Sequence, residues 1–257
     1  RRCRRGDDGG QRHVGIGHEH MPTVVVAACQ MPEIRDDIQR ALSLIAEYTQ
    51  RADAQGARLV CFPECFLQGY FVSSDQEREH ACTIALDLSS HAFQQILLQL
   101  ADLRPMLVFG LIEADADQLY NTAVVIQKGE LVERYRKKHL LGGESFFASD
   151  GRCPIIEIDG LRFGLNICYD TAHPDPAQAV ASQGADLILC LANNMHVRET
   201  SDRIRQLHND ARGERCRETA LWMLSSDVTG ERDDRVSYGP TALLNPQGEV
   251  VAQGPLL

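Results

Sequence analysis

The strongest constraint on the fold is an alternation of short, β-branched apolar runs with amphipathic helical patterns at both ends of the chain. Residues 23–29 and 58–62 have strand patterns, and between them apolar side chains from Ile38 to Tyr48 recur at helical spacing. The centre, from Met106 to Leu140, carries consecutive strand patterns separated by short turns. This mixture predicts an α/β fold with two sheets covered by helices, not one parallel sheet.

The remaining patterns predict further elements of the same kinds. Helical patterns cover roughly 74–87 and 89–102, and a long polar helix is expected over 196–220. Strand patterns are predicted at 155–159, 161–169, 185–193, 221–228 and 240–245, with a helix over 175–183.

Composition restricts the class of protein. The chain has 257 residues and an apolar fraction of 44%, which suits one large soluble domain. A formal net charge of -10 argues against nucleic acid as a partner, since phosphate binding needs a basic face. No apolar run is long enough to span a bilayer, and no segment resembles a signal peptide, so no membrane partner is expected.

The nine cysteines form no paired framework along the sequence, and several lie inside apolar strand patterns. A free cysteine in such a place behaves as a small hydrophobic residue. This usage favours a reducing, cytoplasmic location. Cys61 and Cys65 are spaced as a metal-binding pair, but no second pair completes a zinc site, so no metal is expected.

The first twenty residues differ from the rest of the chain. They hold five Arg, five Gly and three acids but few large apolar side chains. Such a segment cannot bury enough surface to offset the entropy of ordering it. We interpret residues 1–20 as a disordered or foreign arm and 21–257 as a single domain; a basic docking arm is the alternative.

Three residues at the ends of predicted strands could together hydrolyse a carbon–nitrogen bond. That reaction needs a nucleophile, a proton carrier and a positive charge facing the developing oxyanion. Cys168, Glu64 and Lys137 offer these groups, and active sites of α/β folds lie at strand ends. Each residue also has a plain structural interpretation, and sequence spacing does not show that the three lie together.

Three blocks of the sequence resemble the signature blocks of the nitrilase, or carbon–nitrogen hydrolase, superfamily and occur in the family's order. They are CFPECFLQGY (61–70), ERYRKKHL (133–140) and GLNICYD (164–170). The resemblance runs from about Met21 to the C-terminus. It implies a four-layer α-β-β-α sandwich of the nitrilase-like type.

The resemblance also implies site residues. The family's Glu-Lys-Cys triad maps onto Glu64, Lys137 and Cys168, and its second carboxylate maps onto Glu144. The family pattern Tyr-Arg-Lys-x-His-Leu places the catalytic lysine first, which selects Lys137 over its neighbour. The backbone N–H of Tyr169 is the expected second oxyanion donor. No cofactor is implied.

The expected function is hydrolysis of a small linear amide through a cysteine thioester, with release of ammonia, by a homodimer or higher homo-oligomer. An N-carbamoyl hydrolase is the alternative within the same chemistry, and a catalytically silent binding relative is the alternative from another class. Two departures from the family keep these open: Thr171–Asp175 lacks the usual Arg and Phe, and the chain ends at Leu257, where relatives usually continue. The second departure suggests a truncated C-terminus or a different assembly.

Overall fold

A computed structural model describes residues 23–71 and 75–257 of the chain. The arm expected over residues 1–20 lies outside this range, as do residues 21, 22 and 72–74. No helix in the described part of the chain is both long enough and apolar enough to cross a membrane.

One sheet has five strands, in the order β1-β3-β4-β5-β6. The first three are parallel to one another, and the last three form antiparallel hairpins, as the hairpin-rich centre of the sequence predicts. The bounds are β1 (Val26–Ala28), β3 (Leu59–Cys61), β4 (Met106–Asp115), β5 (Gln118–Gln127) and β6 (Glu130–Arg136).

The second sheet has six strands, in the order β15-β14-β11-β9-β8-β7. Its three central strands, β11, β9 and β8, are parallel, and antiparallel strands flank them. The bounds are β7 (Ile156–Ile158), β8 (Leu161–Ile167), β9 (Leu187–Leu191), β11 (Trp222–Ser226), β14 (Ala242–Leu244) and β15 (Val250–Gln253).

A third, smaller sheet was not predicted from the sequence. Its order is β10-β13-β12-β2, and β2 comes from the N-terminal part of the described chain. The bounds are β2 (Met31–Pro32), β10 (His196–Val197), β12 (Val228–Arg232) and β13 (Arg235–Tyr238). Two of these strands have only two residues, too short for a periodic pattern to identify.

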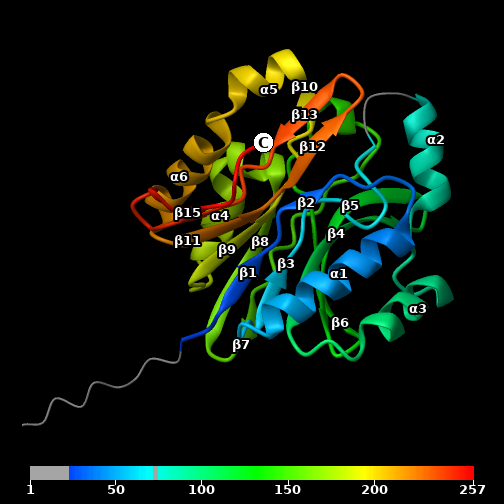
Figure 1. The fold of residues 1–257 in the computed structure, drawn as a ribbon, viewed down its shortest axis with the longest axis horizontal. Coiled ribbons are helices and arrows are strands. Elements are labelled where there is room, and N and C mark those ends of the chain that lie inside the picture. Colours follow the sequence, from blue (N-terminus) through cyan, green and yellow to red (C-terminus); the bar gives the residue numbers. More distant parts are fainter. Residues whose placement is uncertain (1–22, 72–74) are drawn as a thin grey trace, which may run out of the picture.

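The two large sheets pack face to face, and helices cover their outer faces (Figure 1). The alternation of side chains along β3 shows the layering. Leu59 and Cys61 join the core between the sheets, whereas Val60 and Phe62 join the core under α1 (Ile38–Asp53) and α3 (His91–Leu100). On the second sheet, Ile188 packs toward α4 (Pro174–Ala181) and α6 (Leu207–Thr219). The chain is therefore an α-β-β-α sandwich, as the resemblance implied.

Two of the described helices, α1 and α3, begin at a side chain that caps them. The Asp37 side chain accepts a hydrogen bond from the Arg40 N–H at 2.9 Å at the start of α1, and Ser90 accepts from the Phe93 N–H at the start of α3. The bounds are α1 (Ile38–Asp53), α2 (Asp75–Ile84), α3 (His91–Leu100), α4 (Pro174–Ala181), α5 (Arg198–Ile204) and α6 (Leu207–Thr219).

The prediction of one long helix over 196–220 was wrong. The segment forms the short strand β10 and then two helices, α5 and α6, which are separated at Arg205 and Gln206. No proline or glycine marks this break in the sequence, and α6 is polar over most of its length. The apolar spacing therefore could not locate the break.

Candidate active site

The predicted triad residues follow strands that end at one edge of the sandwich. Lys137 and Cys168 come directly after β6 and β8, and Glu64 lies three residues beyond β3. Strand β6 runs in the same direction as β3, because two antiparallel pairings, through β5, link it to β4. The two sheets therefore bring the three side chains to a common region.

A fully buried cluster of one ammonium and two carboxylates lies at this edge. The Lys137 Nζ donates to Glu64 Oε1 at 2.7 Å and to Glu144 Oε1 at 2.8 Å. The side-chain amide of Asn121, on β5, donates to the same two oxygens at 2.7 and 3.1 Å. The backbone N–H of Asn193 donates to Glu64 Oε2 at 2.9 Å. Both oxygens of Glu64 are thus held in place.

Burial and charge set the protonation of this cluster. Burial raises the pKa of Glu64 to about 7, although the nearby Lys137 ammonium opposes the increase. Burial alone would lower the pKa of Lys137, but Glu64, Tyr70 and Glu144 outweigh it and raise that pKa well above its usual value. Lys137 therefore stays cationic, while Glu64 can take up and return a proton near neutral pH.

Cys168 lies beside the cluster in a strained turn. It is a non-glycine residue with φ of 41°, and it begins the short 3-10 helix that runs from Cys168 to Ala172. Strain of this kind is typical of functional turns. The residue as a whole is half-buried. Burial and the Glu64 charge raise its pKa well above the usual range, which Lys137 only partly offsets. The resting thiol is therefore protonated and needs a base before it can attack.

Asp170 links the turn that begins at Cys168 to the segment that carries Lys137. Its Oδ2 accepts from the Tyr135 hydroxyl at 2.8 Å and from the Ile167 N–H at 2.9 Å, and its Oδ1 accepts from the His139 N–H at 2.9 Å. One buried carboxylate thus connects the segments that carry Lys137 and Cys168. Asp170 ends the block GLNICYD, but the sequence alone predicted no role for it.

The other predicted residues also lie here. Glu144 belongs to the turn Gly142–Glu144, and its second oxygen accepts from the Leu141 N–H at 2.7 Å. Tyr169 follows the cysteine, and its ring makes an edge contact with His173. Sequence reasoning missed Asn121, although a polar residue inside the apolar β5 pattern was a usable signal.

Gly110, on β4, leaves no room for a side chain behind Glu64. A Cβ there would lie 2.3 Å from the Cys65 nitrogen and 2.7 Å from the Glu64 Cα. We expect Gly110→Ala to displace Glu64 and reduce turnover by about 10- to 100-fold, because small misplacements of catalytic groups are costly. Gly164→Ala is the control. Its Cβ would meet the two γ-methyl groups of Val180, on α4, at 2.5 and 2.6 Å, away from the cluster.

Both variants should lose stability through overpacking, which a melting curve measures. The Gly164 variant should keep most of its activity. Equal activity losses in the two variants would show that general destabilisation, not the position of Glu64, explains the effect of Gly110→Ala.

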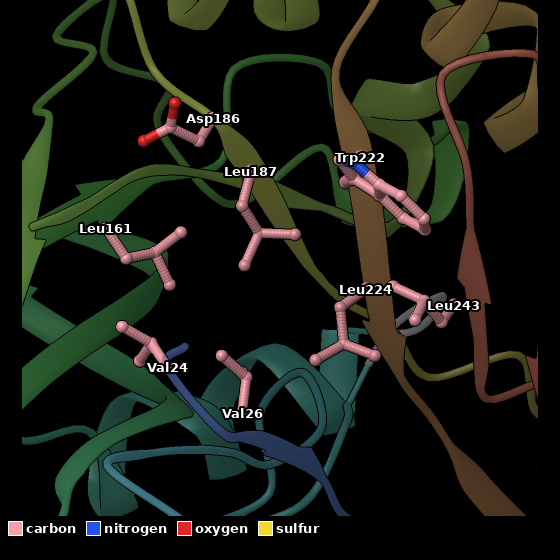
Figure 2. A pocket seen from close by; sticks show the side chains of 8 residues that line it. All are labelled: Val24, Val26, Leu161, Asp186, Leu187, Trp222, Leu224 and Leu243. Atoms are coloured by element: carbon pink, nitrogen blue, oxygen red, sulfur yellow. The ribbon is translucent and has the colours of Figure 1, made fainter. Parts of the chain in front are cut away.

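Outside this cluster, an apolar cavity and a group of potential metal ligands could also hold a ligand. Figure 2 shows an apolar cavity of about 470 Å³ lined by Val24, Val26, Leu161, Asp186, Leu187, Trp222, Leu224 and Leu243. Strands β8, β9 and β11 begin at this cavity, so it lies at the opposite edge of the sandwich from Cys168.

The group of potential metal ligands is a cluster on the surface near the turn that begins at Cys168. Among the described residues, His139, His173 and Asp175 bring potential metal-ligand atoms within 4.8 Å of one another. Asp175 already pairs with the Lys138 ammonium at 2.8 Å and with the His139 ring. The charge of this carboxylate is therefore balanced within the chain.

The sandwich and the carboxylate–lysine–thiol cluster at its strand ends define a hydrolase-like α/β protein of the nitrilase type. The chain belongs to the carbon–nitrogen hydrolase family, whose model matches residues 25–256.

Individual relatives agree with this assignment. A protein named nitrilase from Pyrococcus abyssi is 31% identical over 89% of this chain and 84% of its own. A human omega-amidase is 30% identical over 85% of this chain and 78% of its own. A solved mutant amidase of the nitrilase superfamily from Nesterenkonia AN1 is 25% identical, has a TM-score of 0.75, and is matched over 90% of this chain and 86% of its own.

Proposed function

We propose that this protein is an amidase that hydrolyses a small linear amide through a thioester on Cys168 and releases ammonia. The observation that carries the proposal is the buried Glu64–Lys137–Glu144 cluster beside a half-buried, strained cysteine. The amidase relatives support it, including a human omega-amidase and an (R)-stereoselective amidase from Pseudomonas.

In the proposed mechanism, Glu64 is the base for the attack. It takes the thiol proton as Cys168 Sγ forms a bond to the amide carbon. A pKa of about 7 suits a group that must both accept and return this proton. Glu64 then gives the proton to the departing nitrogen, so that ammonia leaves and a thioester remains on Cys168.

Lys137 is assigned to the oxyanion that forms during the attack. Two of its three N–H donors go to Glu64 and Glu144 within the described part of the chain, and we assign the third to the oxyanion. The backbone N–H of Tyr169 is the second donor that we propose. Water, activated by Glu64, hydrolyses the thioester and restores the thiol. Glu144 shares Lys137 with Glu64 and so orients the ammonium.

The reaction is tested with matched pairs of amides and nitriles. We expect ammonia from small aliphatic or dicarboxylic monoamides and little or none from the corresponding nitriles at equal concentration. A planar amide gives a tetrahedral intermediate with its oxygen toward Lys137, whereas a linear nitrile needs a different geometry and proton delivery. Faster turnover of a nitrile than of its amide would contradict this proposal while leaving the triad in place.

The same panel distinguishes the other functions. Carbon dioxide released together with ammonia from N-carbamoyl compounds, but not from simple amides, would indicate a carbamoyl hydrolase. If no amide or carbamoyl compound is hydrolysed although the protein binds one of them, the chain is a binding relative.

A further inference from the structure

A buried asparagine, Asn194, contacts the Cys168 thiol from the side of the second sheet. Asn194 lies three residues beyond β9 and is almost fully buried. The Cys168 thiol donates to Asn194 Oδ1, with the sulfur 3.7 Å from the oxygen. Nothing in the proposed mechanism requires this contact.

Asp227 fixes which way the Asn194 amide points. The Asn194 Nδ2 donates to Asp227 Oδ2, and the backbone N–H of Asn194 donates to Asp227 Oδ1 at 3.1 Å. Because a carboxylate can only accept from the amide nitrogen, the amide oxygen must face away from Asp227. That orientation turns Oδ1 toward the Cys168 sulfur.

Asp227 is itself held in a buried network. The Arg212 Nη2 lies 3.4 Å from its Oδ2, and the backbone N–H of Asp227 donates to Thr241 Oγ1 at 3.0 Å. Arg212 also donates to the Pro240 carbonyl at 2.5 Å and to Asn209 Oδ1 at 3.0 Å. Side chains paired in this way have little freedom to turn, so the orientation of Asn194 is set before substrate arrives.

We propose that Asn194, held by Asp227 and Arg212, is a positioning residue that orients the Cys168 thiol in the resting enzyme. This inference rests on the proposed role of Cys168 as nucleophile. The hydrogen bond to Asn194 stabilises the protonated thiol and fixes the direction of its S–H bond. Before the sulfur can attack the amide, the thiol proton must leave Asn194 Oδ1 and pass to Glu64.

Several charged and polar groups act on the Cys168 sulfur, and they determine the direction in which the pKa of the thiol should change in each variant. Glu64 and Asp227 raise the pKa of the Cys168 thiol, Lys137 lowers it, and Cys190 is a minor neighbour that raises it. A bond in which the thiol donates favours its neutral form. Removing the Asn194 acceptor or the Asp227 charge should therefore make the thiolate easier to form.

The experiment measures alkylation of Cys168 by iodoacetamide as a function of pH, with the modified peptide quantified by mass spectrometry. In Asn194→Ala, the midpoint of the profile should move to lower pH by roughly 0.5 to 1. Asp227→Asn keeps the shape of the side chain and should move the midpoint in the same direction. The exposed Cys82 is an internal reference, and its profile should not move.

Asn193→Ala is the matched control, because it removes a neighbouring buried amide whose Oδ1 accepts from the Met195 N–H and not from the thiol. It should lower the melting temperature but leave the Cys168 midpoint unchanged. An unchanged midpoint in Asn194→Ala, or an equal change in Asn193→Ala, would overturn the proposal. If Asn194→Ala does not fold, Asn194→Leu, which keeps the side-chain volume but removes the acceptor, takes its place in the same assay, because Asp227→Asn would move the midpoint through its charge alone.

The alkylation assay needs no substrate, so it separates this inference from the proposed function. A wild-type protein without any acyl adduct on Cys168 would remove the nucleophile assignment whatever the alkylation profiles show. A normal adduct together with an unchanged midpoint would leave the amidase proposal standing and remove only the role of Asn194.

Discussion

Replacing Cys168 with alanine is expected to abolish amide hydrolysis, with a loss of at least about 10⁴-fold, while the fold stays intact. The substitution removes the sulfur that we propose forms the acyl bond, and neither Glu64 nor Lys137 can replace it. The side chain is small and half-buried, so the melting temperature should change by no more than about 2–4 °C. Steady-state ammonia release and a melting curve measure the two effects.

Mass spectrometry of the intact wild-type protein with substrate tests the same assignment directly. The mass of an acyl group should appear on Cys168 and be absent from the Cys168→Ala variant. Cys65 and Cys190 also lie near Glu64, but both are fully buried and burial raises the pKa of each thiol. An acyl group on either of them would contradict the assignment. Cys82→Ala, which removes an exposed thiol on α2, is the control that should remain active.

The sequence predicted the strands that position the site better than it predicted the site's connections. The apolar run in RLVCF predicted a buried strand before Glu64, and the apolar run before Cys168 predicted β8. These are local patterns that an extended chain must satisfy to bury one or both faces. The 2.7 Å contact between Lys137 Nζ and Glu64 Oε1 joins residues that are far apart in the sequence. Only the family resemblance suggested that these two residues lie together.

The polar residues around the triad show what local patterns cannot reveal. Asn194 and Asp227 are 33 positions apart; Asn194 follows one predicted strand and Asp227 lies in another, and nothing in the sequence links them. Their pairing depends on how β9 and β11 lie side by side, which no periodicity encodes. The same limit applies to the small third sheet, where β2 pairs with β12 from the far end of the chain. Tertiary contacts decide such features.

The two adjacent lysines should respond very differently to replacement by alanine. Lys137→Ala should lose activity by about 10³-fold or more, because it removes the proposed oxyanion donor and the cation that lowers the pKa of Glu64. Without that ammonium, Glu64 and Glu144 are two buried carboxylates that, among the described residues, share only the Asn121 amide, so Glu64 should hold its proton at neutral pH and no longer act as a base. Stability should also fall, since a buried charge network loses its only described ammonium partner.

Lys138→Ala is the matched control, because this side chain is 37% exposed and pairs with the exposed carboxylate of Asp175. An ion pair of this kind contributes little, so turnover should change by less than about threefold. Lys137→Met, which retains most of the side-chain volume, separates loss of charge from loss of packing and should be as inactive as Lys137→Ala. Ammonia release from one amide, measured for all three variants, decides the matter. Equal losses in the Lys137 and Lys138 variants would show that the buried ammonium has no special role, and the assignment of the oxyanion donor would then fail.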